Sequence, residues 1–284
     1  MLSNKFKVNY SVGAVANGVK TDTFTFFLLF FYSNIIGLNP GLAGSAIFIA
    51  LCIDAITDPL MGTISDRTNS SFGRRHPYMF ISFIPMSLGY ILLFAPRQEW
   101  DMSQSDLFVW MTIFTVITRI GMTLFDIPHR AFGGEITKNY KERTILMSWR
   151  EMFAWVAGLS NAFLGYGVFF ASTPEFPQGQ LNPDVWFPFA LTGAAIMVFS
   201  VLYSSFSTKD EINSLSKWSG AISLLDIFNE LKIAVGNKSF LIFFFGNLFL
   251  SLAWGLSNSL TLFVNTYFWE FEATQIKYFL PIYL

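Results

Sequence analysis

Seven apolar runs, each about as long as a lipid bilayer is thick, constrain the fold of this chain more than any other feature. A helix needs about 20 mostly apolar residues to cross the hydrocarbon core of a membrane. The runs are Tyr10–Leu38, Leu42–Gly62, Tyr78–Ala95, Leu107–Phe132, Thr144–Ser172, Trp186–Ser207 and Phe240–Val264. An eighth run begins near Ile276 and the sequence stops at Leu284, so we expect an incomplete chain. The pattern predicts an all-α protein that crosses a membrane seven times.

The composition excludes several other classes of protein. Hydrophobic residues make up 53% of the chain and charged residues 13%, whereas soluble domains have about 25% charged residues. The net charge of −1 gives no reason to expect a nucleic-acid partner. The single cysteine, Cys52, excludes a disulfide framework and a cysteine-based metal site.

Basic residues collect in the loops on one side of the predicted membrane. On that side are Lys5, Lys7, Arg67, Arg74, Arg75, Lys138, Lys141, Arg143, Lys209, Lys217, Lys232 and Lys238. Only Arg97 and Lys277 fall in loops on the other side, and the loop 173–186 has neither Lys nor Arg. Loops rich in Lys and Arg stay in the cytoplasm. We therefore predict a multi-pass protein of the plasma (inner) membrane with a cytoplasmic N-terminus.

The order of the runs suggests three parts. Residues 1–208 are predicted to form a six-helix transmembrane half, 209–239 a cytoplasmic linker, and 240–284 the start of a second half, with helix seven and the beginning of helix eight. In the linker, apolar residues recur at helical spacing at Leu224, Phe228, Leu231 and Val235. This predicts an amphipathic helix on the inner membrane surface; a solvated linker is the alternative. At the membrane boundaries, an aromatic belt is predicted to include Trp100, Trp110 and Trp186.

Seven charged residues interrupt the apolar runs. They are Lys20, Asp22, Asp54, Asp58, Arg119, Asp126 and Arg150. Each costs about 2.5–3.5 kcal/mol at the centre of a membrane helix, so such residues face one another or water. Either they form ion pairs that lock helices together, or they line a polar cavity, which we favour for the set as a whole.

Two of these residues, Asp54 and Asp58, lie four residues apart in the stretch "DAITDPLMG". Residues at this spacing share one face of a helix. Pro59 lacks an N–H, so the carbonyl of Ala55 loses its usual partner beside them. Freed backbone groups are tolerated in a membrane where they line a cavity.

A polar stripe of the same kind is predicted on the fourth run. Its members, Arg119, Thr123, Asp126 and Arg130, are spaced by four, three and four residues and so share a face. Pro128 is predicted to kink the stripe near its inner end.

The paired carboxylates predict a site for a small cation. Two carboxylates about 5–6 Å apart in a low dielectric resist being ionised together. A proton or Na⁺ relieves this repulsion, and carboxylates with a hydroxyl of Thr57 or Thr123 and a backbone carbonyl are hard oxygen ligands. Coupling would follow if the same cavity bound a solute.

Four segments carry a resemblance to a known family. They are "GLAGSAIFIALCIDAITDPLMGTISDRTNSSFGRRHP", "RIGMTLFDIPHRAFGGEIT", "YKERTILMSWR" and "GNKSFLIFFFGNLFL". Together they resemble the glycoside–pentoside–hexuronide:cation symporters, the melibiose-carrier branch of the major facilitator superfamily. The resemblance implies twelve helices in two six-helix halves around a central site that opens alternately to each side. This chain would supply the first half, helix seven and the start of helix eight.

The resemblance also implies roles for individual residues. The expected cation site comprises Asp54, Thr57, Asp58, Thr123 and Asp126, and the expected solute site comprises Gly18, Lys20, Asp22, Asp126, Arg130 and Arg150. Gly18 stands where the melibiose carrier has a sugar-binding aspartate, and Asp22 is expected to replace it from the same face. Arg130 stands where that carrier has an aromatic residue that stacks on the sugar. The additional basic groups would suit an anionic solute such as a hexuronide, or would only neutralise the aspartates.

The segment "GTISDR…GRR" resembles the loop between helices two and three of the superfamily. The resemblance implies a gating loop that comprises Gly62, Asp66, Arg67, Gly73, Arg74 and Arg75. In it, Gly62 would allow helices to approach closely and Asp66 would make gating contacts.

The predicted activity is therefore symport of a sugar or glycoside with Na⁺ or H⁺ by alternating access. Its partners would be a small solute and the lipid bilayer, with no cofactor beyond the coupling ion, and the full-length protein would be monomeric. One alternative is the same fold with a lysolipid or another amphipathic anion as cargo. A remote one is an intramembrane enzyme of the aspartyl protease type, but the Tyr-Asp and Gly-x-Gly-Asp motifs of those proteases are absent here, and Asp54 follows Ile53.

Overall fold

The first apolar run forms a helix with several interruptions. It begins after Ser3, whose side chain accepts a hydrogen bond from the Phe6 amide, and it ends at Gly37, whose φ of 88° favours glycine. Its parts are α1 (Asn4–Ser11), α2 (Ala14–Asp22), the π-helical turn η1 (Thr23–Phe27), α3 (Leu28–Phe30) and the π-helical segment η2 (Phe31–Ile36). In the computed structural model, which describes residues 2–214, 233, 235–272 and 275–277, this helix one lies inside the bundle, with most of its residues buried.

The remaining spans start at side-chain caps or prolines that match their sequences. Asn39 caps α4 and Pro40 occupies its first position, while Ser103, Asn139 and Asn237 cap the later helices. The elements are α4 (Pro40–Arg67), α5 (His76–Ile81), α6 (Phe83–Leu93), α7 (Gln104–Glu135), α8 (Tyr140–Leu164) with the π-helical turn η4 (Gly165–Phe169), α9 (Trp186–Ser207) and α11 (Lys238–Tyr267). Short 3₁₀ turns are η3 (Gln98–Trp100), η5 (Gly179–Leu181), η6 (Pro183–Val185) and η7 (Lys209–Ser214).

These helices confirm the predicted all-α membrane fold. Among the described residues, six helical stretches are long and apolar enough to cross a membrane, and helix one supplies the seventh predicted span. Helix three is divided between α5 and α6 at Ser82, where Pro85 cannot donate to the carbonyl of Ile81. The predicted spans fall within the observed helices to a few residues at each end.

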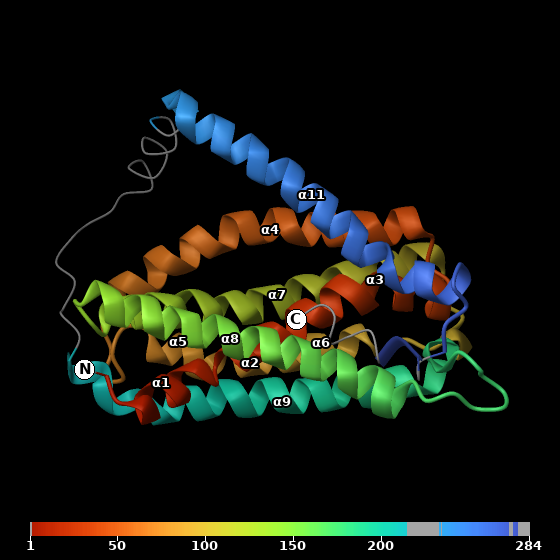
Figure 1. Cartoon of the computed structure of the whole chain (residues 1–284), viewed down its shortest axis with the longest axis horizontal. Helices are drawn as coiled ribbons and strands as arrows, with labels where there is room; N and C mark the ends of the chain where they lie inside the picture. The colour runs from red at the N-terminus through yellow and green to blue at the C-terminus, as the bar shows by residue number, and fades with distance from the viewer. Residues whose placement is uncertain (1, 215–232, 234, 273–274, 278–284) are drawn as a thin grey trace.

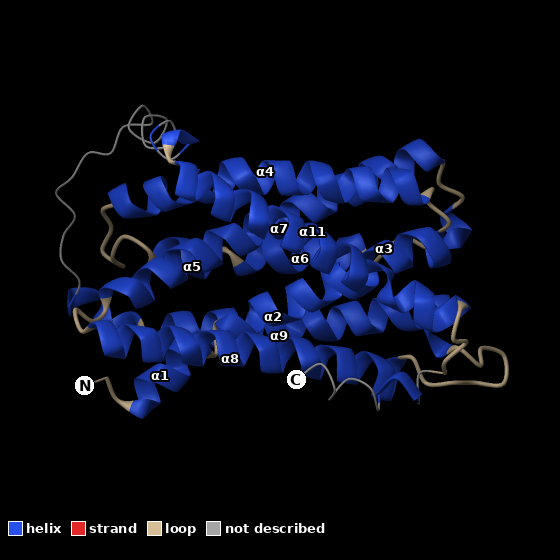
Figure 2. Ribbon diagram, turned by 45° about the horizontal axis from the view of Figure 1, so that its top comes forward, coloured by secondary structure: helices blue, strands red, loops and turns tan. Residues whose placement is uncertain are grey.

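The helices pack as an elongated bundle (Figures 1 and 2). α7 packs against α4 and α6, α2 packs against α8 and α9, and α6 packs against α9. α11 crosses the bundle and contacts helix one at η1 and α3. The N-terminus and the ends of α4, α7 and α9 lie at the left in Figure 1, and the loop after η4 lies at the right.

A cluster of aromatic side chains fills the core at the end of the bundle where helix one finishes. The rings of Phe170 and Trp186 lie 4.8 Å apart, and those of Phe31 and Trp186 lie 5.3 Å apart. Trp186 is fully buried, and its indole N–H donates to the carbonyl of Gln180. The prediction that Trp186 belongs to an interfacial belt was therefore wrong, because Phe30 and Phe31 of helix one pack against its ring and it is not exposed to lipid. Trp100 is exposed, as predicted.

Two predictions lie largely outside the described residues. The amphipathic helix was predicted around 224–235, of which only residues 233 and 235 are described. The eighth helix was predicted from Ile276, and only residues 275–277, which are helical, are described there. Both stay predictions, as does the division at 208 and 239.

Candidate functional site

The two aspartates of α4 both face α7, as their spacing predicted. Asp54 forms an ion pair with Arg119, and Asp58 Oδ1 accepts a hydrogen bond of 2.6 Å from the hydroxyl of Thr123. Arg119 and Asp54 are 13% and 20% exposed, so the pair is largely removed from solvent. Of the two aspartates, Asp54 therefore already has a basic partner, while Asp58 has a hydroxyl partner.

Oxygen atoms without partners lie on the same stretch of α4. Asp54 Oδ1 and the Thr57 hydroxyl are buried and make no hydrogen bond. Buried acceptors are normally hydrogen-bonded, and each exception requires an explanation, such as a place for an ion that binds there. With Asp58 and Thr123, these atoms are oxygen ligands of the type that hard cations prefer.

The inner part of the α7 stripe meets α8 in a second charged cluster. Asp126 accepts from Arg150 of α8 through Oδ1 and from Arg130 Nε through Oδ2, the latter at 2.7 Å. Arg150 also pairs with Glu151 at 2.5 Å, and Arg130 lies 3.9 Å from Glu151. We call these four residues the Asp126 cluster. It contains two acids and two bases and is therefore neutral as a group.

Burial within the Asp126 cluster is uneven. Arg150 is fully buried and Asp126 is 15% exposed, whereas Arg130 and Glu151 are each about half exposed. Both oxygens of Asp126 are occupied by guanidinium groups, so a solute would have to displace Arg130 or Arg150 to reach them. Arg130 and Glu151 are accessible without rearrangement. Arg130 offers several guanidinium N–H donors, and Glu151 offers a carboxylate acceptor.

The helix-one residues of the predicted solute site are not all in one place. Gly18 packs against the backbone of α8, where an added Cβ would lie 2.1 Å from the carbonyl oxygen of Ala154. Asp22 is buried on the same side and accepts a hydrogen bond of 2.7 Å from Asn161 of α8. Both residues thus lie at the contact between helix one and α8, and neither touches the Asp126 cluster.

Lys20 points to a different neighbour. Its ammonium lies 6.0 Å from the ring centroid of Phe24, and the guanidinium of Arg119 lies 5.5 Å from the same ring. Cations are attracted to the face of an aromatic ring at such distances. Phe24 thereby brings Lys20 next to the Arg119–Asp54 pair, at the junction of helix one with α7.

The predicted gating loop contains a network of ion pairs at the Lys- and Arg-rich end. Arg75, which is almost fully buried, contacts Asp66 at 2.8 Å and Glu135 at 2.6 Å, and Arg74 also pairs with Glu135. The network joins the end of α4, the start of α5 and the end of α7. Gly73 has a φ of 74°, a conformation that favours glycine.

Two other residues of this loop take no part in the network. Arg67 is exposed. At Gly62 an added Cβ would lie 3.8 Å from Ile127, an ordinary contact, so space does not require a glycine there.

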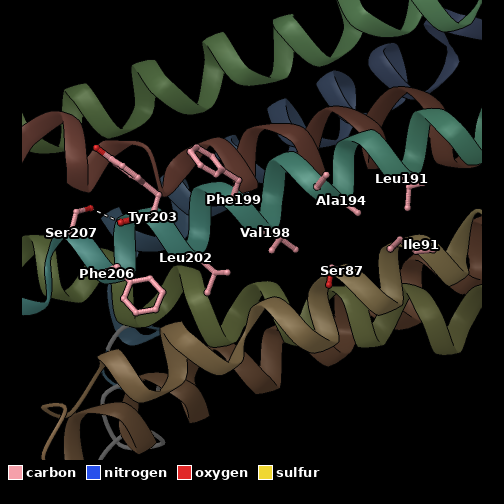
Figure 3. A pocket seen from close by; sticks show the side chains of 11 residues that line it. Ser87, Ile91, Leu191, Ala194, Val198, Phe199, Leu202, Tyr203, Phe206 and Ser207 are labelled. Carbon is pink, nitrogen blue, oxygen red and sulfur yellow. Dashed lines mark hydrogen bonds between the residues drawn. The ribbon is translucent and has the colours of Figure 1, made fainter.

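A separate groove of about 830 Å³ lies between α6 and α9 (Figure 3). Ser87 and Ile91 of α6 face Ala194, Val198 and Leu202 of α9. Its lining includes none of the charged residues of the predicted sites. It belongs to the apolar surface of the bundle, and it does not coincide with the polar groups on α4, α7 and α8.

Sequence reasoning missed four residues that complete these contacts: Glu135, Glu151, Asn161 and Phe24. Glu151 could have been found, since it is a charge that directly follows Arg150 in an apolar run. The other three are ordinary helix residues, and only the packing of their helices reveals a role.

Comparison with known proteins identifies the family. The chain matches the model of the MFS/sugar transport protein family over residues 9–283. The chain therefore belongs to this family of the major facilitator superfamily, as its motifs indicated. Membrane-embedded, multi-pass proteins of this family are transporters and not enzymes, which confirms that an enzyme was correctly excluded.

Three relatives show how much of the chain is shared. The uncharacterized symporter YnaJ of Bacillus subtilis is 30% identical over 94% of this chain and 55% of its own length. The putative glycoside/cation symporter YagG of Escherichia coli is 27% identical over 84% of this chain and 49% of its own length. The sodium-dependent lysophosphatidylcholine symporter 1-A of Danio rerio is 29% identical over 59% of this chain and 31% of its own length. The chain spans about half the length of the curated relatives it matches, or less.

Proposed function

We propose that the protein is a secondary active transporter that couples the entry of a small cation, Na⁺ or H⁺, to symport of a sugar or glycoside. The observation that carries this proposal is the polar face built by α4, α7 and α8 inside an apolar bundle. Ionisable residues at membrane depth are expensive and typically mark pathways for ions and solutes. The name of one relative, a putative glycoside/cation symporter, agrees with this assignment.

The cation site of this proposal centres on Asp58. Among the described residues its carboxylate has only a hydroxyl partner, Thr123, and the unpartnered oxygens of Asp54 and Thr57 lie on the same stretch of helix. A cation at this place would meet hard oxygen ligands, and no cofactor beyond the coupling ion is required. Arg119 would have to loosen its ion pair before Asp54 could take part.

The solute site of this proposal centres on the half-exposed members of the Asp126 cluster. Arg130 offers several N–H donors and Glu151 offers acceptors, which together suit the hydroxyl groups of a sugar. Secondary transporters bind their solute at the interface between two repeats. In this proposal residues 1–208 form one repeat, 209–239 link it to the other, and 240–284 begin that other repeat.

Uptake by membrane vesicles that contain the full-length protein, with both repeats, tests the proposal. A panel of labelled sugars and glycosides is offered with and without an inward gradient of Na⁺ or H⁺. We expect saturable accumulation of at least one sugar or glycoside, driven by one of the two gradients. Facilitated uptake that ignores both gradients would contradict the coupling, and uptake of none of the panel would contradict the solute class.

The same assay with Asp58→Asn tests the assignment of the cation site. This change keeps the volume of the side chain and the partner Thr123 but removes the negative charge. We expect solute binding to persist while its stimulation by the cation, and uphill accumulation, are lost. Coupling is reciprocal, so a cation that no longer binds cannot alter solute affinity. The matched control is Asp106→Asn. Asp106 lies in the first turn of α7, far along the helix from Thr123, and it exchanges hydrogen bonds with the N-cap residue Ser103.

A second candidate cargo is a lysolipid, because one relative is named as a sodium-dependent lysophosphatidylcholine symporter. The vesicle assay therefore includes a labelled lysophospholipid. Cation-driven uptake of the lysolipid without uptake of any sugar would favour this second candidate.

A further inference from the structure

Asp22 is a buried acid whose partners are all uncharged. It is 8% exposed, and its Oδ2 accepts a hydrogen bond of 2.7 Å from Asn161 Nδ2. Within the part of the chain that the structure describes, Asp22 forms no ion pair and no hydrogen bond reaches its Oδ1. In this it differs from Asp54 and Asp126, which pair with arginines.

Asn161 has an unused acceptor at the same place. It is 2% exposed, and its Nδ2 donates both to Asp22 and, at 3.1 Å, to the hydroxyl of Thr23, which also accepts from Tyr90 at 2.7 Å. Asn161 Oδ1 is buried and has no hydrogen-bond partner. The network therefore contains one amide oxygen that requires a donor and lies on the same planar group as the nitrogen that contacts Asp22.

No charged side chain among the described residues pairs with Asp22, and the arginines of α7 and α8, which both pack on α2, are paired with other acids: Arg119 with Asp54, and Arg130 and Arg150 with Asp126. The residues of α8 near Asp22 are Asn161 and Gly158. From α6, the hydroxyl of Tyr90 donates to the hydroxyl of Thr23, the residue that follows Asp22. α9, which packs on α2, has no acidic or basic residue between Trp186 and Ser207, and the charge of α11 is Lys238 at its distant start. On α2 itself, Lys20 lies two residues away and its ammonium is directed to the ring of Phe24.

Protonation would satisfy every polar group in this network. An ionised Asp22 would leave a charge at membrane depth next to Asn161, whose buried Oδ1 would still lack a donor, and such groups are costly to bury. A proton on Asp22 Oδ1 would make that oxygen a donor, and Asn161 Oδ1, on the amide group that already contacts Asp22, would be its acceptor. Acid and amide would then share two hydrogen bonds.

We propose that Asp22 and Asn161 form a proton-binding site at the contact between helix one and α8, in which Asp22 is a neutral carboxylic acid and Asn161 is its positioning residue. The site is separate from Asp54 and Asp58, whose partners lie on α7. It is independent of the proposed function, since it can be occupied whatever solute the protein carries.

Infrared absorption of the protein in lipid vesicles at neutral pH tests the proposal, because a protonated carboxyl has a carbonyl band that a carboxylate lacks. We expect the wild-type protein to show this band and Asp22→Asn to lose it, and Asn161→Leu to shift it to higher frequency because the hydrogen bonds to the acid are removed. Asp54→Asn is the matched control and should leave the band unchanged, since Asp54 is held by Arg119. If Asp22→Asn removes none of the protonated-carboxyl absorption of the wild type, or if the wild type has no such absorption, the proposal is overturned.

A second measurement needs no variant. Dicyclohexylcarbodiimide reacts with protonated carboxyl groups in apolar surroundings, so peptide mapping of the treated wild-type protein should find the modification on Asp22. Raising the pH until the infrared band disappears should abolish this labelling. Labelling of Asp54 or Asp58 in place of Asp22 would contradict the assignment.

Discussion

Asp126 shows how a single residue can serve structure and function together. It is predicted to bind solute and cation, yet both of its oxygens are taken by arginines in the structure. A buried ion pair adds little net stability, but removal of one member leaves the other charge uncompensated. Under the proposed function, the Asp126 cluster would be a preorganised set of charges that a solute rearranges.

The first prediction at this scale concerns Arg150. Arg150→Gln removes a fully buried charge that neutralises Asp126 and Glu151. We expect a loss of stability of about 3–5 kcal/mol, since a partner of a buried pair is removed. If Arg150 also contacts solute, affinity should fall by roughly ten- to more than a hundred-fold, the effect of about 1.5–3 kcal/mol for a charge-assisted hydrogen bond.

Thermal unfolding in detergent and binding of the transported solute measure the two effects of Arg150→Gln separately. Arg143→Gln is the matched control, because Arg143 is exposed on the same helix and donates only to the carbonyl of Thr137. If Arg150→Gln unfolds like the wild type, the ion pair is not maintained in the membrane.

Individual contacts could be predicted from sequence only where both partners carry an unusual signal. Asp54, Asp58, Arg119 and Thr123 stand out as polar residues in apolar runs, and their shared faces follow from helical spacing. Asn161 gave no such signal. Whether it meets Asp22 depends on how α8 is rotated and how deeply it packs against helix one, and hydropathy fixes neither.

At the scale of elements, the break in helix one between α1 and α2 is the feature that periodicity did not predict. The carbonyl of Tyr10 lies at this break and accepts from Gly13 N, from His129 Nε2 at 3.0 Å and from the Ser204 hydroxyl at 3.1 Å. The rings of Tyr10 and His129 are stacked 4.2 Å apart. Side chains of α7 and α9 thereby stabilise this break, which the continuous apolar run gave no reason to expect.

The second prediction follows from the crowding at this break. An added Cβ at Gly13 would lie 2.7 Å from Phe125, 2.8 Å from Ser204 and 2.9 Å from His129. We expect Gly13→Ala to destabilise the protein by about 1–3 kcal/mol, the usual cost of overpacking. Thermal unfolding in detergent measures the change.

Gly44→Ala on α4 is the control for Gly13→Ala, because nothing lies within 4 Å of an added Cβ there. It should be neutral or slightly stabilising, since alanine favours a helix interior more than glycine does. Equal effects of the two substitutions would show that the break in helix one is not tightly packed.

At the scale of the whole molecule, the loops separate into two ends as their charges predicted. The Lys- and Arg-rich loops lie with the N-terminus at the left in Figure 1, and the loop 171–178, free of Lys and Arg, lies at the right. Hydropathy sufficed for the number and order of the spans, because each run is long and the loops between them are polar. Which end faces the cytoplasm stays a prediction.

The third prediction tests that orientation with single cysteines in a Cys52→Ser background, since Cys52 is exposed. Glu175 and Asn69 are exposed positions in loops at opposite ends. In intact cells an impermeant thiol reagent should label Glu175→Cys, whereas Asn69→Cys should react only after the cells are opened. The reverse pattern would invert the topology and place the Arg74–Glu135 network outside.

The close contact at Gly18 has a mechanical consequence. Here the backbone of helix one touches the backbone of α8, and at Gly121 the backbone of α7 approaches that of Met86 in the same way. No side chain lies between the two backbones at either contact, so no change of rotamer could accommodate a small displacement of one helix against the other. Helix one and α8 should therefore move together as one rigid pair, and α6 and α7 as another, so that any rearrangement of the bundle has to occur between these pairs.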